Sequence, residues 1–241
     1  MLSLLFASLV YSQPPVPNKQ RPRIGETVKE RLVRLYKDHK VVSYKNTRIL
    51  MYNEVDCVDD KINLIYGGNT YDWKCHGTGI PSATVVNAEH TIPQSTFSKK
   101  QPMVTDLFHI YSSPSKLNSM RSNYKFAEID YDTCSYYCRN NECSKTRPSE
   151  ETQDEYSCLS GDKKYWMPRK GDKGRVARSV FYFYTMYDGS VSTVGDLNTF
   201  KQWNILYPPD AQEKARCDAI NQTQGNRNPY IDDPSLVDEV F

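Results

Sequence analysis

The chain has 241 residues, enough for one large domain or two small ones, and its hydrophobic content of 38% supports a buried core. Its formal net charge is only +2, which rules out an argument for a nucleic-acid partner from global charge. Any attraction to a polyanion must therefore be local. Beyond the N-terminus, no stretch is long and apolar enough for a membrane helix, so we expect no membrane partner.

The first 13 residues form an apolar run that ends in small and polar residues and is too short to span a bilayer. The run resembles a secretory signal peptide at 1–12, with Ser12 as the last residue before cleavage, although it lacks a positively charged start. A buried N-terminal segment is the alternative. Prolines crowd residues 13–24, which predicts an extended leader before a folded domain at 25–241.

The first part of the folded domain carries short predicted elements. Apolar residues recur at helical spacing over 27–40 and predict an amphipathic helix. Residues 41–44 predict either a strand or the exit from that helix. Two short segments at 48–52 and 61–66 flank an acidic turn, which lacks the ligand spacing of an EF-hand loop and is therefore interpreted as solvated.

The stretch at 85–124 organises the rest of the chain. A pair of valines predicts a strand that runs into Glu89 and His90, and a second apolar run at 107–111 predicts another strand. The Ser-Pro pair at 113–114 resembles an N-cap followed by the first position of a helix. The stretch therefore predicts a strand, a loop, a strand and a helix.

Four side chains of this stretch suit phosphodiester chemistry. Glu89 and Asn118 offer hard oxygen atoms for Mg²⁺ or a similar cation, which would keep several waters because two protein ligands are few. His90 adjoins the carboxylate and ordinarily titrates near neutrality, as a general base should. Arg121 lies three residues after Asn118, on the same helix face, and is placed to hold a phosphate oxygen.

Basic residues near and beyond this stretch suggest where nucleic acid would lie. Residues 163–178 carry seven basic side chains and one acid, with two aromatic residues among them, a pattern typical of backbone binding and base stacking. A solvated loop that enters a helix is the alternative. The expected nucleic-acid contacts are Lys99, Lys100, Lys170, Lys173 and Arg175.

The C-terminal third is predicted to be helical. An apolar stripe indicates a helix over 174–187, Leu197 starts a second short one, and Asp210 caps a third over 211–222. The segment at 225–232 is interpreted as a turn whose polar groups cross-link these helices to the central stretch.

Seven cysteines agree with secretion, because an oxidising compartment pairs most of them. We expect a bridge between Cys57 and Cys75. The four cysteines between 134 and 158 are expected to staple their own loop, a polar insertion at 133–158, with the pairing inside it left open. Cys217 lies alone on a predicted helix and is expected to be the free thiol.

Four segments of the chain together resemble one family. They are N-A-E-H-T-I-P-Q-S at 87–95, D-L-F-H-I-Y at 106–111, K-L-N-S-M-R-S-N-Y at 116–124 and Q-G-N-R-N-P-Y-I-D at 224–232. In this order they resemble the endonuclease I family of secreted non-specific nucleases, part of the ββα-metal (His-Me finger) superfamily. Four ordered segments are far more specific than a single Glu-His pair.

The resemblance implies a role for each matching residue. It implies that Glu89 is the metal carboxylate, His90 the general base and Asn118 the second metal ligand, with Mg²⁺, or Ca²⁺ or Mn²⁺, as the cation. The family often has two adjacent histidines after Asp-Leu, but here the first is Phe108. His109 therefore receives no metal role, and it either orients water or phosphate near the metal or is a core histidine.

We therefore expect an α+β fold, in which a ββα-metal motif, an antiparallel hairpin plus a helix, is embedded in a mainly helical single domain. The expected function is a secreted, metal-dependent endonuclease that hydrolyses DNA and RNA without sequence preference to 5′-phosphate products. We expect it to act as a monomer in an extracellular, periplasmic or digestive-vacuole space. Because Phe108 stands where the family often has a histidine, an alternative is a secreted disulfide-rich protein that binds nucleic acid on an inactive nuclease scaffold.

Overall fold

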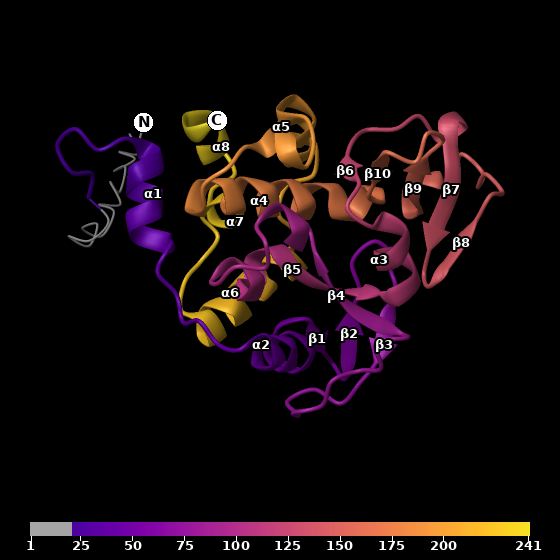
Figure 1. Ribbon diagram of the computed structural model, residues 1–241, viewed down its shortest axis with the longest axis horizontal. Coiled ribbons are helices and arrows are strands. Elements are labelled where there is room, and N and C mark those ends of the chain that lie inside the picture. Colours follow the sequence, from indigo (N-terminus) through magenta and orange to yellow (C-terminus); the bar gives the residue numbers. More distant parts are fainter. Residues whose placement is uncertain (1–20) are drawn as a thin grey trace, which may run out of the picture.

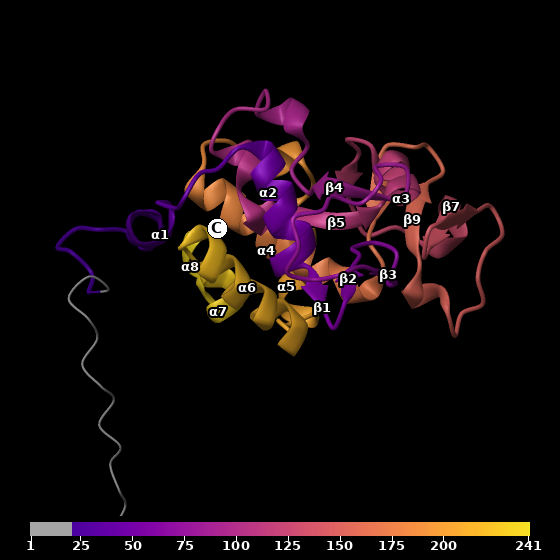
Figure 2. The same cartoon turned by 90° about the horizontal axis from the view of Figure 1, so that it is seen from below.

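The computed structural model describes residues 21–241, so the expected signal peptide and most of the expected leader lie outside the described residues. Figure 1 shows helix α4 crossing the middle of the molecule, with further helices on one side and a five-stranded sheet on the other. In both ribbon views the hairpin of β4 and β5 lies between these two parts (Figures 1 and 2).

Helices and small sheets alternate along the chain, which confirms the mixed α+β class. The helices are α1 (Val28–Tyr36), α2 (Tyr44–Leu50), α3 (Ser115–Arg121), α4 (Lys170–Met186), α5 (Leu197–Leu206), α6 (Ala211–Gln224), α7 (Pro229–Asp232) and α8 (Leu236–Val240). Among residues 21–241, none of the helices is long and apolar enough to cross a bilayer.

The strands form three separate sheets. One has the order β1-β2-β3, built from Cys57–Val58, Lys61–Asn63 and Thr70–Asp72. The second pairs β4 (Val86–His90) with β5 (Ile110–Pro114). The third has the order β6-β10-β9-β7-β8, built from Lys125–Phe126, Tyr165–Met167, Ser157–Ser160, Cys134–Arg139 and Glu142–Ser144.

Helix α4 is the centre of the hydrophobic core. The apolar stripe that predicted it is buried, including Val176, Val180 and Phe181. Helices α1, α5 and α7 pack against it. The helix begins at Lys170, one turn before the predicted start at 174, and Asp172 in this first turn accepts a hydrogen bond from the backbone N–H of Tyr66. This hydrogen bond from Tyr66 therefore stabilises the start of α4, where Gly171 and Gly174 have low helix propensity.

The N-terminal elements differ from their prediction in detail. Helix α1 begins after a capping box formed by Thr27 and Glu30, and it is shorter than the predicted span of 27–40. Residues 41–44 form no strand, because Ser43 instead caps α2. The segment at 48–52 lies in α2 and the helical turn that follows it, where Met51 and Tyr52 are fully buried.

The hairpin and helix at 85–124 are present, with shifted boundaries. Strand β5 pairs antiparallel with β4, so that Glu89 lies opposite Tyr111. The predicted strand at 107–111 is wrong in its first half, because the Asp106 carboxylate caps a 3₁₀ turn over Leu107–His109. The predicted N-cap at Ser113 is also wrong, since pairing with β4 continues through Pro114 and the helix begins one residue later.

The disulfide predictions are confirmed. Cys57 bonds to Cys75, and the four cysteines between 134 and 158 pair among themselves as 134 with 158 and 138 with 143. Cys217 is free and buried. The expected polar loop at 133–158 contains two strands of the five-stranded sheet and the start of a third, because cross-strand pairing organises it as well as the two bridges.

Loop length predicts how much each bridge contributes to stability. Replacing Cys57 and Cys75 by serine releases a loop of 18 residues, and the free energy of unfolding should fall by about 3 kcal/mol. The matched replacement of Cys138 and Cys143 releases a loop of 5 residues and should cost about 2 kcal/mol. Urea unfolding of both variants measures the difference, and a larger loss from the shorter loop would contradict this account.

Candidate active site

The four side chains singled out in the sequence line one open cavity. Glu89 and His90 come from the end of β4, and Asn118 and Arg121 come from α3. All four border a hollow of about 300 Å³. β5 pairs antiparallel with β4, and α3 follows β5 directly and packs against β4, so residues far apart in the chain face the same space.

Glu89 is a buried carboxylate with two partners. The Tyr66 hydroxyl donates to its Oε1 at 2.9 Å, and Nη1 of Arg121 lies 3.3 Å from the same oxygen. Burial raises the pKa of Glu89 to about 7, against the opposing effects of Arg121 and Tyr66. The group therefore exchanges its proton near neutral pH.

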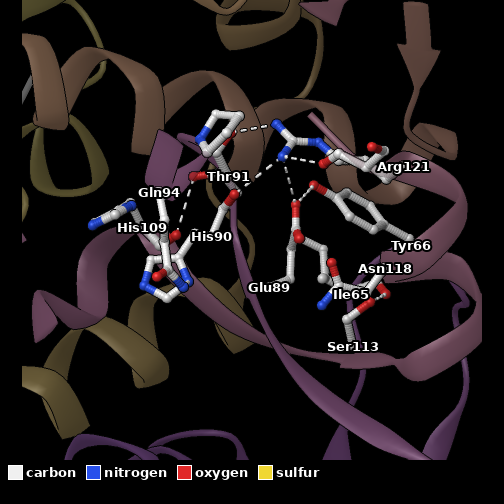
Figure 3. A network of polar contacts seen from close by, with 12 residues as sticks. Ile65, Tyr66, Glu89, His90, Thr91, Gln94, His109, Ser113, Asn118 and Arg121 are labelled. Atoms are coloured by element: carbon white, nitrogen blue, oxygen red, sulfur yellow. Dashed lines mark hydrogen bonds and ion pairs between the residues drawn. The ribbon is translucent and has the colours of Figure 1, made fainter. Parts of the chain in front are cut away.

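Arg121 is buried beneath the cavity and is held on several sides. Its Nη1 donates to the carbonyls of His90 and Ser122, both at 3.2 Å, and its Nη2 donates to the carbonyl of Thr91 at 2.5 Å. Figure 3 shows the guanidinium directed at Glu89 and at these carbonyls. The phosphate contact expected from the sequence would require one of these acceptors to be released.

The hydrogen bonds of His90 assign its proton. Its Nε2 lies 3.2 Å from the carbonyl oxygen of Val104, which can only accept, so Nε2 carries the proton and donates. Its Nδ1 is then an acceptor, and it lies 3.1 Å from the amide nitrogen of Gln94. Burial, first of all, together with the neighbouring His109 and Arg121, lowers the pKa of His90 to about 3, so the ring is neutral.

Asn118 completes a set of hard oxygen donors. Its amide nitrogen donates to the carbonyl of Ala88 at 3.5 Å, which leaves the amide oxygen available. Over residues 21–241, no group of three or more His, Cys, Asp or Glu side chains is arranged to hold a metal. One carboxylate and one amide oxygen fit a cation that keeps several waters, and this is the habit of Mg²⁺.

Comparison with known sequences then settles the family. The endonuclease I family profile matches residues 24–235, nearly the whole of the described chain. The chain belongs to the endonuclease I family.

Individual relatives cover most of the chain at low identity. An extracellular ribonuclease of Bacillus subtilis (strain 168) is 25% identical over 91% of this chain and 75% of its own length. An extracellular ribonuclease of Bacillus amyloliquefaciens is 27% identical over 90% of this chain and 74% of its own length. An extracellular deoxyribonuclease of Aeromonas hydrophila is 23% identical, with 96% of each chain covered.

Two residues at this endonuclease I site were missed by sequence reasoning. Tyr66 lies in the connection between β2 and β3, and no local sequence pattern connects it with Glu89. Gln94 lies within the N-A-E-H-T-I-P-Q-S segment, so its place four residues after His90 was the available signal.

The two positions at the family's histidine pair lie in the core. His109 is fully buried, and its Nε2 donates to the carbonyl of Met103 at 2.6 Å. Its ring packs 4.9 Å from that of Phe183 and 5.3 Å from that of His90, centroid to centroid. Phe108 packs against Tyr182 instead of entering the cavity. These contacts favour the core-histidine interpretation of His109.

The C-terminal signature segment cross-links the helices to the site, as its polar residues predicted. Gln224 donates to Asp106 at 2.9 Å and accepts from the backbone N–H of Leu107 at 2.9 Å. Asn228 donates to a backbone carbonyl of α4 at 3.1 Å, and Arg227 forms ion pairs with two aspartates. The segment therefore anchors the chain between β4 and β5 to the core.

The basic residues expected to contact nucleic acid fall into two groups. Lys99 and Lys100 are exposed on the loop that follows His90, and neither forms an ion pair with a described residue. The other three pair with acids: Lys170 with Asp154, Lys173 with Glu128 and Arg175 with Asp210. A nucleic acid that used this second group would have to displace those carboxylates.

A larger hollow of about 590 Å³ lies between the three-stranded sheet and α6, and none of the four site residues borders it. Each of its three arginines is held by an aspartate. These ion pairs are Arg169–Asp172, Arg175–Asp210 and Arg216–Asp56. Because the charges are already paired, we place the candidate site in the smaller cavity with Glu89 and His90.

Replacing Arg121 by glutamine tests its role in holding the site together. The change leaves Glu89 without its counter-ion and three carbonyls without their donor, so the free energy of unfolding should fall by about 3 kcal/mol or more. The control is Arg139→Gln, which removes an exposed ion pair with Glu155 and should cost less than about 1 kcal/mol. Urea unfolding at pH 8 measures both, and equal losses would contradict a supporting role for Arg121.

Proposed function

We propose that this protein is a secreted, metal-dependent endonuclease that hydrolyses DNA and RNA without sequence preference. The convergence of Glu89, His90 and Asn118 on one open cavity carries the proposal. Relatives named as ribonuclease and as deoxyribonuclease support action on both nucleic acids. Their extracellular naming and the three disulfides of this chain support secretion.

Glu89 and Asn118 are the residues that would hold the cation, Mg²⁺ or another divalent ion. When bound, the cation supplies positive charge that stabilises the scissile phosphate and the leaving 3′-oxygen. Tyr66 and Arg121 keep the Glu89 carboxylate turned toward the cavity. Arg121 thus acts through Glu89 and the β4 backbone.

His90 is the general base of the proposed reaction. Because its Nε2 is committed to the carbonyl of Val104, the attacking water must lose its proton to Nδ1. The water oxygen bonds to phosphorus, the bond from phosphorus to the 3′-oxygen breaks, and the 3′-oxygen takes up a proton from solvent. The products carry a 5′-phosphate and a 3′-hydroxyl.

Loss of His90 should remove most of the activity. His90→Ala should lower the rate of plasmid cleavage at least about a hundredfold, because no other group takes the proton from water. A chelator should abolish cleavage by the unaltered protein. His76→Ala is the matched control, since this exposed histidine pairs with Glu54 on the surface and should leave the rate unchanged.

Supercoiled plasmid and single-stranded RNA should both be digested in this assay. Activity that persists in chelator, or in His90→Ala, would refute the proposal. Salt-dependent binding without any release of nucleotides would instead indicate an inactive scaffold.

The elevated pKa of Glu89 predicts how cation affinity depends on pH. With a pKa of about 7 in the metal-free protein, the carboxyl is protonated below pH 7 and must release its proton to bind a cation. The dissociation constant for Mn²⁺ should therefore rise about tenfold per pH unit below pH 7 and level off above it. Calorimetric titration measures this, with Glu89→Gln as the control that should lose high affinity at every pH.

A further inference from the structure

We propose that Gln94 is a positioning residue for His90. It holds Nδ1 as an acceptor facing the cavity until the attacking water takes its place. The inference rests on the proposed function, because it assigns a task to Gln94 only if His90 is the base.

The direction of each hydrogen bond around His90 leaves one arrangement. A backbone carbonyl has no proton to give, so Val104 accepts and His90 Nε2 donates. A neutral imidazole has one N–H, so Nδ1 accepts. The group 3.1 Å from Nδ1 must then donate, and the side-chain amide of Gln94 supplies that N–H. The ring is thus hydrogen-bonded at both nitrogens, in the tautomer with the proton on Nε2 and a lone pair on Nδ1 for a general base.

Gln94 combines an anchored backbone with a side chain that can move. It begins a short 3₁₀ turn directly after Pro93, and its carbonyl accepts from the backbone N–H of Lys99 at 3.1 Å. Its side chain is half-buried and borders the same cavity as Glu89 and His90. The amide can therefore swing away from the ring while the backbone of the loop stays in place.

Water and the Gln94 amide compete for the same nitrogen of His90. Figure 3 shows Gln94 beside the His90 ring. The amide nitrogen lies 3.1 Å from Nδ1. Because one lone pair of Nδ1 cannot serve both an amide and a water, the attacking water must displace the amide.

Two substitutions of Gln94 separate this role from simple packing. Gln94→Ala leaves Nδ1 open to water but removes one of the two hydrogen bonds that hold the His90 ring, and kcat should fall about tenfold. Gln94→Glu has nearly the same size but replaces the donor by an acceptor, so Nδ1 either turns away or carries a proton. Its kcat should fall about a hundredfold, as for loss of the base, with KM little changed in both variants.

A matched variant controls for added negative charge. Ser95→Glu places the same charge one residue along, and Ser95 makes no hydrogen bond to His90 among the described residues. Charge repulsion of the substrate should appear there as a higher KM. Nitrogen chemical shifts of the His90 ring give a readout independent of activity, with Nδ1 unprotonated in the unaltered protein and protonated or displaced in Gln94→Glu.

The order of the rates decides the inference. If Gln94 only filled space, Gln94→Glu, the closer match in size, would be more active than Gln94→Ala, and that order would overturn the positioning role. A fall in kcat for Ser95→Glu equal to that of Gln94→Glu would also overturn the positioning role. If His90→Ala remains active, the proposed function itself fails. If His90→Ala is inactive while Gln94→Glu cleaves as fast as Gln94→Ala, only the positioning role fails.

Discussion

The buried ion pair between Glu89 and Arg121 is the contact on which the site depends. Burying either charge alone would be costly, and the contact between Glu89 and Arg121 offsets part of that cost where β4 meets α3. Arg121 also binds the carbonyls of His90 and Thr91, and the chain leaving β4 is thereby tied to α3. A single guanidinium therefore links α3 to the end of β4 and to the residue after it.

The segment between β4 and β5 is held from the other side of the molecule. The carbonyls of Met103 and Val104 accept from the two buried histidines, so this segment sets the orientation of His90. Asp106 fixes the segment in turn, because it accepts from two tyrosines of the α4 region and from Gln224 at the end of α6. Residues 76 to 118 positions downstream of Asp106 therefore help to fix the position of His90.

The charge distribution fits a protein that attracts a polyanion only locally. The net charge is +2, and four basic residues of the stretch at 163–178 are paired with acids from other segments. Lys99 and Lys100 remain exposed on the loop that follows β4. Screening limits the reach of such charges to roughly 8–10 Å, so they attract a polyanion only at short range.

The sequence by itself determined the family and several local elements. The proposed roles of Glu89, His90, Asn118 and Arg121 also come from residue type and short spacing, and the structure adds that all four border one cavity. The buried helix around Val180 was predictable from apolar periodicity. The expected bridge from Cys57 to Cys75 is present, although spacing alone does not fix which cysteines pair.

Only the tertiary structure decided how these groups act. It brought Tyr66 to Glu89, turned Nδ1 of His90 toward Gln94, and occupied Lys173 with Glu128. It also converted the start of the second predicted strand into a capped turn at Asp106. Hydrogen bonds and ion pairs depend on distance and direction between segments far apart in the chain, and neither composition nor periodicity encodes those quantities.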